Sequence, residues 1–401
     1  MSNPFQIQAT DSSTVARTGR LWTRRSAVQT PVFMPVGTQA AVKTLTPQEV
    51  ADAGSQIILA NTYHLMLRPG VEIIRTAGGL HAFMSWNGPI LTDSGGYQVF
   101  SLSARRTVRE HGVEFRSHHD GRRLELTPES ALDLQLAFGS DVVMPLDQLA
   151  GYDDPSDEQA TAADRTLRWL ERSVVHFRAA TDQTEQRPLL FAIAQGGFDA
   201  SRRQDHARRT AQMPVDGFSI GGLSVGEEKG ELFAMLDASV AGLPPNRARY
   251  LMGVGSPEDL WKAVARGVDM FDCVHPTRVA RRGAFFTYDG RVNITASRFK
   301  TQMDPVDPVC DCQTCHAFSA AYIHHLFRSG EMLGPRLATI HNIRFMHRLT
   351  EQMREAINAG EFERQMRAFL DRYQPADEHV ARDQRARWRK HRAEEPERSA
   401  N

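Results

Sequence analysis

The sequence predicts an α/β fold, a (β/α)8 TIM barrel with antiparallel additions and a small insert towards its C-terminal end. Short apolar runs alternate with helical stretches eight times along the 401 residues, and this repeated alternation is typical of a closed parallel barrel. Most of these runs are continuously apolar, as expected for parallel strands that are buried on both faces. A doubly wound open sheet is the alternative, but no G-x-G-x-x-G follows an early strand to support it.

Eight segments are expected to form the barrel strands because they are short, apolar and rich in β-forming residues. They are Val32–Val36, Gln56–Ala60, Pro89–Thr92, Asp141–Leu146, Leu189–Ala194, Phe218–Gly221, Tyr250–Val254 and Met270–Val274.

Helix-start signals follow several of these strands. Thr46 with Glu49 three residues later forms a capping box, and proline occupies the first helical position. Thr127-Pro128 and Ser256-Pro257 repeat the cap followed by proline, and the second pair leads into an apolar stripe that stops at Gly267. These signals place a helix after each of three strands, as the barrel requires.

Other parts of the chain do not follow the strand–helix alternation. Residues 1–31 and 98–126 are polar and contain turn signals, so we expect antiparallel strands added to the barrel. A later segment contains a cysteine cluster and a helix, which we expect to form the insert. The expected division is a barrel from 1–304 and 351–374, an insert from 305–350, and a charged, flexible tail from 375–401.

The composition is that of a globular protein, with 41% hydrophobic and 24% charged residues. We find neither a run of about 18 apolar residues nor a secretory signal at the N-terminus, so we expect a cytoplasmic protein without a membrane span. The formal net charge is zero. A nucleic-acid partner would therefore have to be bound by a local basic patch.

Polar residues stand at or after the ends of several predicted strands, where a barrel of this kind places its active site. Asp93, Asp147 and Asp272 follow or close three strands, and Gln195 follows a fourth. Glycines after the end of this fourth strand and after two further strand ends would let a flat ligand approach the backbone closely. A single Asp at a strand end is more often a helix cap, but three that converge on one mouth indicate a functional site.

Paired carboxylates suit substitution at the anomeric carbon of a sugar. One carboxylate attacks and holds the sugar covalently, while another group manages the proton on the leaving group. Such a retaining double displacement suits an exchange reaction, because the covalent intermediate waits for an incoming group instead of water.

Three of the four cysteines, Cys310, Cys312 and Cys315, lie within six residues, and His341 follows 26 positions later. In a protein expected in the cytoplasm, such spacing indicates a metal before a disulfide. Three thiolates and one imidazole complete a tetrahedral Zn2+ shell, so we expect one closed, structural zinc site per chain. The alternative is three buried thiols beside an unrelated histidine.

Four motifs make the chain resemble the tRNA-guanine transglycosylases, specifically their bacterial queuine tRNA-ribosyltransferase branch. The motifs are NTYHL from Asn61, LTDSGGYQ from Leu91, GGLSVGE from Gly221 and MFDCVHPTR from Met270. The resemblance extends from about Thr18 to Tyr373 and includes the zinc spacing.

The resemblance implies roles for individual residues. Asp272 stands at the position of the nucleophile, Asp93 at that of the general acid/base, and Asn61 at that of the residue that positions Asp93. Arg278 and Arg281 match the anticodon-binding loop. The residues at positions that bind or stack on the base are Tyr97, Asp147, Gln195, Gly221, Gly222, Leu223 and Met252.

The implied reaction replaces the wobble guanine of tRNAs with a G-U-N anticodon by 7-aminomethyl-7-deazaguanine, in queuosine biosynthesis. The resemblance also implies a homodimer that the zinc-binding segment helps to form. The side chains agree with these partners, since a carboxylate accepts from the N–H groups of a 7-deazaguanine base and an aromatic face stacks on it. The target base must leave its stack to react, which requires a shaped pocket.

The sequence departs from the bacterial pattern at Gln148-Leu149, where the family usually has Glu-Cys, and at His275, which replaces an apolar residue. Val225 keeps the bulkier bacterial residue, which favours the small aminomethyl base. We interpret His275 as a solvated loop residue, with a phosphate or base contact as the alternative. Further candidates for contacts with RNA phosphates are Arg282, Lys300 and the basic stretch Arg382–Arg392.

Other functions remain open at this point. A queuine-salvaging enzyme would share the motifs, whereas an archaeosine-type enzyme usually carries a C-terminal RNA-binding domain, for which residues 374–401 are too few. A non-catalytic RNA-binding partner subunit would lack catalytic positions, yet Asp93 and Asp272 are both present. An unrelated zinc-stabilised hydrolase barrel would not explain the whole motif set.

Overall fold

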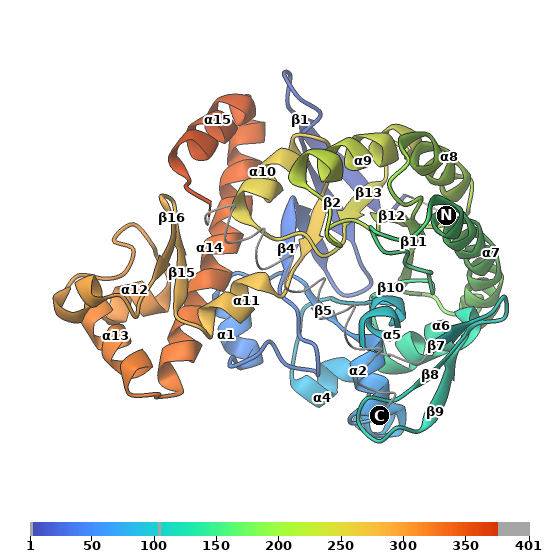
Figure 1. Ribbon diagram of the computed structural model, residues 1–401, viewed down its shortest axis with the longest axis horizontal. Helices are drawn as coiled ribbons and strands as arrows, with labels where there is room; N and C mark the ends of the chain where they lie inside the picture. Colours follow the sequence, from blue (N-terminus) through green and yellow to red (C-terminus); the bar gives the residue numbers. More distant parts are fainter. Residues whose placement is uncertain (1–2, 103–105, 376–401) are drawn as a thin grey trace.

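The computed structural model describes residues 3–102 and 106–375. At its centre lies a sheet of eight parallel strands surrounded by helices (Figure 1), which confirms the expected TIM barrel. Each strand overlaps one of the eight expected segments, and most are shorter than expected. The strands are β4 (Val32–Met34), β5 (Ile58–Ala60), β6 (Ile90–Thr92), β10 (Val142–Val143), β11 (Leu189–Ala194), β12 (Gly217–Ile220), β13 (Ala248–Leu251) and β14 (Met270–Asp272).

The sheet closes on itself. Its strand order is β4-β14-β13-β12-β11-β10-β6-β5, and a parallel bridge between Val36 and Leu59 joins the two ends. The Leu59 amide donates to the Pro35 carbonyl at 3.0 Å, and the Gly37 amide donates to the Leu59 carbonyl at 2.6 Å. The first and last strands of this order are therefore neighbours, as in a barrel.

The strand residues divide between two apolar cores, one inside the barrel and one beneath the helices. On β4, Val32 and Met34 belong to the inner core, while Phe33 between them belongs to the outer one. On β11, Phe191 and Ile193 alternate with outward-facing neighbours in the same way. Burial on both faces explains why these strands are continuously apolar in the sequence.

Helices follow the barrel strands in turn and surround them (Figure 1). Thr46 forms the expected capping box with Glu49, and Thr127 forms one with Ser130. Ser256 is the N-cap of its helix, but its side chain makes no capping hydrogen bond. These helices are α1 (Pro47–Asp52), α2 (Thr62–Leu67), α3 (Val71–Thr76), α4 (Leu80–Met84), α5 (Gly96–Leu102), α6 (Pro128–Phe138), α7 (Ser156–Thr181), α8 (Ala200–Ala211), α9 (Lys229–Gly242), α10 (Pro257–Val264) and α11 (His275–Ala280).

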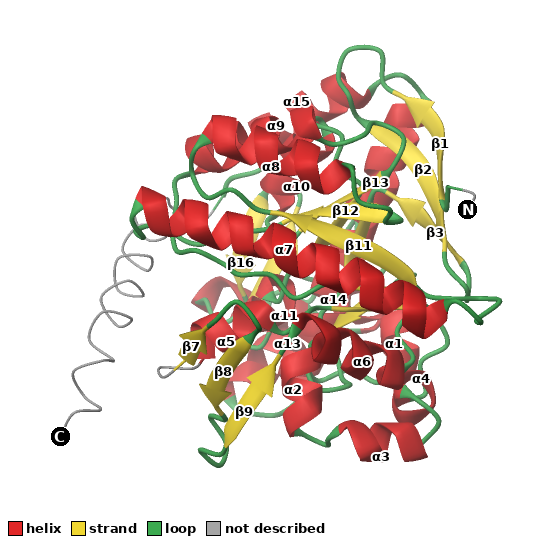
Figure 2. Cartoon of the chain, turned by 90° about the vertical axis from the view of Figure 1, so that its right-hand side faces the viewer, coloured by secondary structure: helices red, strands yellow, loops and turns green. Residues whose placement is uncertain are grey.

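Two antiparallel sheets are added to the barrel, as expected. Strands β1 (Phe5–Thr10), β2 (Arg17–Trp22) and β3 (Ala27–Thr30) form one sheet, and it contributes Phe5, Leu21 and Val28 to the inner barrel core. Strands β7 (Arg106–Val108), β8 (Val113–Arg116) and β9 (Arg123–Leu126) form the other, beside α5 (Figure 2). The expectation of strand structure was wrong for residues 98–102, which are helical and belong to α5.

The cysteine-containing segment lies against the barrel through one long helix. α14 (Leu333–Asn358) runs without a break through residue 350, the expected end of the insert, and contacts both α12 and the barrel strand β4. A separate small apolar core includes Phe285, Ile323 and Leu337. The other elements here are β15 (Ala284–Thr287), β16 (Gly290–Asn293), η1 (Ser297–Thr301), α12 (Gln313–Ala317), α13 (Ala320–Arg328) and α15 (Phe362–Arg372).

Within the described ranges, no helix has both the length and the apolar character needed to cross a membrane. The charged tail expected from residue 375, with its basic stretch Arg382–Arg392, lies outside these ranges except for residue 375 itself.

Candidate active site at the barrel mouth and candidate metal centre

Asp93 follows β6 directly and is held by its neighbours at the end of β5. Its Oδ2 accepts from Asn61 Nδ2 at 2.6 Å, and its Oδ1 accepts from the Thr62 amide at 2.8 Å. The Thr62 hydroxyl donates to the Asp93 carbonyl at 2.6 Å. Burial raises the pKa of Asp93 to about 6, against the opposing effect of these hydrogen bonds.

Asp272 closes β14 and is held through only one of its two oxygens. The Tyr250 hydroxyl donates to Asp272 Oδ1 at 2.5 Å, and the Gly253 amide donates to the same oxygen at 2.7 Å. Gly253 has φ +74°, a left-handed conformation that favours glycine. No described residue hydrogen bonds to Oδ2 of Asp272.

The two carboxylates belong to one electrostatic site. Burial raises the pKa of Asp272, and the negative charge of Asp272 adds to the effect of burial on the pKa of Asp93. The charges of both also raise the pKa of the buried Tyr250 phenol well above its usual value, after burial itself. Tyr250 therefore remains a hydrogen-bond donor at any physiological pH.

Asp147 lies beyond the end of β10 and is joined to the strand ends on either side. Its Oδ1 accepts from the Ser94 hydroxyl at 3.1 Å, and its Oδ2 accepts from Gln195 Nε2 at 2.7 Å. Burial raises the pKa of Asp147 as well. The structure thus brings together Asp147 and Gln195, as the strand ends predict, and ties them to Ser94, the residue after Asp93.

The glycine turn after β12 is supported from below by a fully buried arginine. Arg203 on α8 donates to the carbonyls of Gly197, at 2.9 Å, and Gly221, at 3.0 Å, and burial lowers its pKa to about 10. Gly222 has φ +69°, and a Cβ there would collide with the Gln195 side chain. Leu223, the next residue, is buried.

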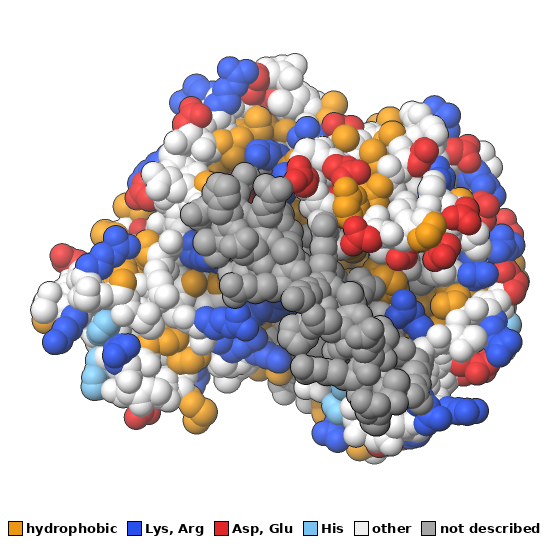
Figure 3. Space-filling model, viewed as in Figure 1, with side chains coloured by type: hydrophobic (Ala, Val, Ile, Leu, Met, Phe, Trp, Pro, Cys, Tyr) orange, Lys and Arg blue, Asp and Glu red, His pale blue; other side chains and the backbone are white. Residues whose placement is uncertain are grey.

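Two other predicted positions lie at the edges of this site. Tyr97 is the second residue of α5 and is 52% exposed, while Met252 follows β13 and packs partly buried against the inner core. The expected RNA contacts, Arg278 and Arg281, lie at the end of α11, where Figure 3 shows Lys and Arg side chains gathered. Arg281 also donates to the Thr277 carbonyl at 2.9 Å.

The four expected metal ligands meet in one buried cluster. One ligand atom from each of Cys310, Cys312, Cys315 and His341 lies within 4.8 Å of all the others. His341 is in the middle of α14, and its Nδ1 is 3.2 Å from the Cys315 sulfur. Its Nε2 is 2.7 Å from the Phe286 carbonyl, which assigns the hydrogen to Nε2 and leaves Nδ1 as a ligand.

The positions that depart from the bacterial pattern have defined surroundings. Gln148 Oε1 accepts from Arg165 at 2.5 Å, and Leu149 lines a cavity of about 150 Å³ that Asp147 also lines. His275 is not a fully solvated loop residue, because its ring is partly buried and lies 6.0 Å from that of Phe286. Burial lowers the pKa of His275 to about 4, so it is uncharged at neutral pH.

Sequence reasoning missed three residues that act on the site. Tyr250 lies inside a barrel strand, where it reads as an ordinary core residue. Arg203 lies on an outer helix 18 positions before the carbonyl of Gly221 that it supports. Gln98 on α5 forms a side-chain hydrogen bond with Asp93. A buried Tyr one position before the end of β13 carries no signal of its own, whereas Gln98 lies within a recognised motif.

Comparisons with known proteins match nearly the whole chain to a single family. The profile of the family described as queuine tRNA-ribosyltransferase matches residues 11–375. A protein of that name from Dictyoglomus turgidum is 48% identical over 386 residues, which cover 96% of this chain and 99% of the relative. One from Desulforudis audaxviator is 51% identical over 366 residues, 91% and 97% of the two chains. One from Herpetosiphon aurantiacus is 50% identical over 384 residues, 96% of each.

Proposed function

This chain belongs to the queuine tRNA-ribosyltransferase family, and we propose that it exchanges guanine through Asp272 as nucleophile and Asp93 as general acid/base. Family membership at this identity makes it a tRNA-guanine transglycosylase, a pentosyltransferase of queuosine biosynthesis. The observation that best supports the proposed roles is the difference between the two carboxylates. Asp272 has one oxygen without a partner among the described residues, and Asp93 has a pKa of about 6.

The first half of the reaction forms an ester between Asp272 and the ribose. Oδ2 of Asp272 attacks the anomeric carbon, the bond from that carbon to guanine breaks, and its electron pair leaves with the base. The departing guanine takes a proton from Asp93. Tyr250 and the Gly253 amide keep Asp272 Oδ1 engaged, so Oδ2 is presented to the ribose in one orientation.

The second half reverses these bonds with a different base. The incoming base gives a proton to Asp93, attacks the anomeric carbon and releases the Asp272 carboxylate. A group that both donates and accepts a proton works best when its pKa lies near the working pH. The pKa of Asp93 near 6 supports this double role.

The base is recognised by Asp147 and Gln195 with the backbone at Gly221, Gly222 and Leu223. Asp147 accepts from the N–H groups of a guanine-type ring, and the Gln195 amide donates to its carbonyl oxygen. The mutual hydrogen bond of these side chains, at 2.7 Å, supports a common target. Tyr97 and Met252 enclose the two faces of the base, and Asn61 fixes Asp93. The incoming base is 7-aminomethyl-7-deazaguanine.

The RNA substrate is a tRNA with a G-U-N anticodon, and the exchanged base is its wobble guanine. Arg278 and Arg281 bind the anticodon loop next to the reacting nucleotide. Arg278 on α11 and Arg281 directly after it stand six and nine residues after Asp272, which supports this role because α11 leaves the barrel mouth directly. A uracil edge offers carbonyl acceptors to these guanidinium donors.

The buried group of three thiols and one imidazole can hold a metal ion, and we infer that the ion is Zn2+. All four tetrahedral positions would be filled by the protein, so the ion stabilises the fold and takes no part in the exchange. Tyr322, Met332 and Leu333 near this group are 38%, 86% and 36% exposed. These apolar side chains support a homodimer formed through this region.

Incubation with labelled guanine and an unmodified G-U-N tRNA tests the function. Label should enter the RNA and remain bound after denaturation of the protein. If the protein binds the tRNA without incorporating label, it is an RNA-binding subunit and the proposed catalysis is wrong. Competition between 7-aminomethyl-7-deazaguanine and queuine then separates the biosynthetic form from the salvaging one.

A further inference from the structure

The turn between β8 and β9 places two exposed histidines beside the barrel mouth. The Tyr63 hydroxyl lies 2.8 Å from His118 Nδ1, and the ring of His119 lies 4.0 Å from that of His118. Tyr63 follows Thr62, whose amide holds Asp93. The turn is therefore tied to the chain segment that positions the proposed acid/base.

The hydrogen bond to Tyr63 determines which nitrogen of His118 faces outward as a donor. The backbone amide of His118 also hydrogen bonds to the Tyr63 oxygen and lowers its pKa, although burial raises that pKa overall. The arrangement in which the phenol oxygen accepts from this amide and donates its own hydrogen to Nδ1 of the imidazole satisfies both groups. The hydrogen of the neutral ring is then on Nε2, the nitrogen that is not bound to Tyr63.

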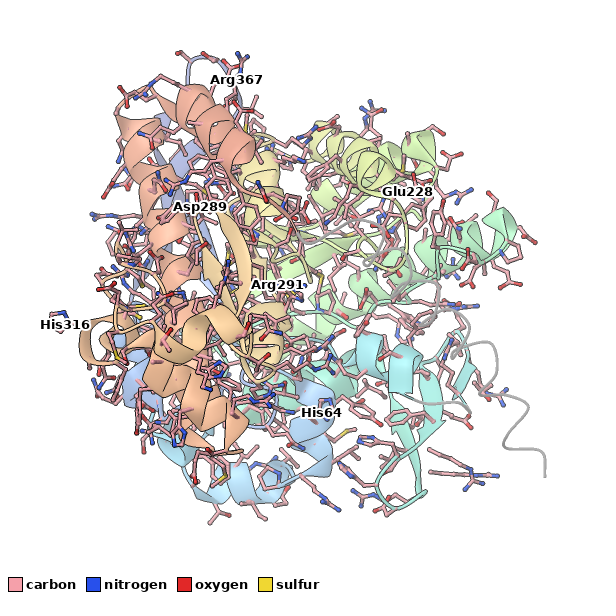
Figure 4. All side chains as sticks on the ribbon, turned by 60° about the vertical axis from the view of Figure 1, so that its left-hand side comes forward. His64, Glu228, Asp289, Arg291, His316 and Arg367 are labelled. Atoms are coloured by element: carbon pink, nitrogen blue, oxygen red, sulfur yellow. The ribbon has the colours of Figure 1, made fainter. Side chains whose placement is uncertain are left out.

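Positive charge surrounds these histidines. Burial lowers the pKa of His118 most, and the charges of His119 and of Arg68, at the end of α2, lower it further. The pKa of His64 is lowered most by burial, then by the charges of His118 and His119, and also by that of Lys43. Figure 4 shows His64 on α2. Permanent cations thus act on His118, whose lowered pKa keeps its ring a neutral N–H donor.

Within the described part of the chain, no carboxylate forms a hydrogen bond or ion pair with the side chains of His64, His118 or Arg68. None contributes to the pKa shift of His64 or His118. Asp120, the nearest acidic residue along the turn, forms an ion pair with Arg122 at 3.4 Å. The exposed guanidinium of Arg68 has no hydrogen-bond partner among the described residues. Donors without acceptors are suited to an anion, and on an RNA enzyme the available anion is a phosphodiester.

We propose that Arg68, His118 and His119 bind a phosphodiester of the RNA strand next to the reacting nucleotide. This inference rests on the proposed function and deepens it. α2 and the β8–β9 turn lie on a different side of the mouth from α11 (Figure 1), so the RNA backbone is held on two sides. Holding the strand on both sides of the target keeps the extruded guanine over Asp93 and Asp272.

Arg68→Gln tests the charged contact with a G-U-N anticodon stem-loop as the probe. Losing one single-strand phosphate contact should weaken the RNA affinity about fivefold at roughly 0.1 M salt, and lower the slope of log affinity against log salt by about 0.7. Arg68→Lys should keep most of the slope because it keeps the charge. Arg208→Gln, an exposed site on the outer helix α8, is the matched control and should change neither quantity.

His118→Phe tests the neutral donor. The ring remains, but the N–H group is lost, so RNA affinity should fall about tenfold, the value of one hydrogen bond to a charged group. The salt slope should stay unchanged, because a neutral group releases no counterion. Guanine affinity, measured on the same variant without RNA, separates loss of the contact from loss of the fold at Tyr63.

The outcomes distinguish this inference from the proposed function. If wild-type protein exchanges guanine but Arg68→Gln binds the stem-loop with unchanged affinity and slope, the phosphodiester site is wrong and the proposed function stands. If Arg68→Gln changes the oligomeric state in native mass spectrometry and leaves RNA affinity unchanged, the surface contacts a second copy of the chain instead. If wild-type protein exchanges no guanine, the proposed function itself fails.

Discussion

Two buried polar clusters in this protein differ in whether their reactive atoms are all engaged. In the cysteine–histidine cluster, four ligand atoms face one another within 4.8 Å, and the remaining nitrogen of His341 faces the Phe286 carbonyl. At the barrel mouth, Asp272 receives hydrogen bonds from Tyr250 and Gly253 on one oxygen, and the other has no partner in the described part of the chain. A cluster that is complete in itself stabilises the fold, whereas one with a free atom can react.

The two clusters also differ in what they contribute to the free energy of folding. Binding a metal to a closed set of thiolates and imidazole adds directly to folding free energy. Burying Asp93, Asp147 and Asp272 works against folding at neutral pH, because burial raises the pKa of each above its usual value. We therefore expect loss of a ligand from the cysteine–histidine cluster to destabilise the protein, and loss of a buried carboxylate at the barrel mouth to stabilise it.

The largest effect on activity is expected from Asp272→Asn. An amide is a poor nucleophile, so exchange should fall by at least about 10^4-fold, the scale seen when a catalytic nucleophile is removed. The denaturant-resistant adduct between protein and labelled tRNA should disappear from a denaturing gel. Asp371→Asn, an exposed site on α15, is the matched control. An adduct that persists in Asp272→Asn would show that another residue attacks the ribose.

Cys312→Ala removes one ligand from the cysteine–histidine cluster. Structural zinc sites are worth on the order of 10–16 kcal/mol of binding free energy, so losing one thiolate should release the metal and lower the melting temperature markedly. Metal content by elemental mass spectrometry and thermal unfolding measure both effects. Cys273→Ala is the control, since Cys273 lies outside the cluster, and it should retain the metal. Equal metal content in the two variants would refute the ligand assignment.

Tyr250→Phe sharpens the comparison by removing one of the two donors to Asp272 without removing the nucleophile. A hydrogen bond to a charged group is worth about 1.5–3 kcal/mol, so kcat should fall about 10- to 100-fold. KM for tRNA should change little, because Tyr250 is buried beneath the site. An unchanged kcat would mean that the Gly253 amide alone orients Asp272.

The smallest effect is a pH-dependent gain in stability from Asp93→Asn. The folded pKa of about 6 exceeds the model-peptide value of 3.8, so wild-type stability is greatest below the lower value and falls as pH rises through 6. Removing this charge should stabilise the fold by up to about 3 kcal/mol at pH 8 and by roughly half as much at pH 5. Urea unfolding at both pH values measures this. A gain that does not grow with pH would contradict the raised pKa.

The sequence by itself determined the barrel and most of the candidate site. The continuously apolar strands are buried on both faces, and this local property is readable without the fold. Strand ends meet at one mouth by topology, so Asp93, Asp147 and Asp272 could be grouped from their positions alone. The spacing of Cys310, Cys312 and Cys315 was equally local, and His341, 26 positions after Cys315, was a ligand type that completes a tetrahedral site.

Tertiary structure alone decided how these groups are held. Tyr250 and Asp272 are 22 positions apart, and Arg203 and Gly221 are 18 apart, so their contacts depend on how neighbouring strands and helices align. The same holds for Tyr63 with His118, 55 positions apart. A residue type in a sequence shows what chemistry is available. Only the packed fold shows that burial raises the pKa of Asp93 and that, among the described residues, both hydrogen bonds to Asp272 reach the same oxygen.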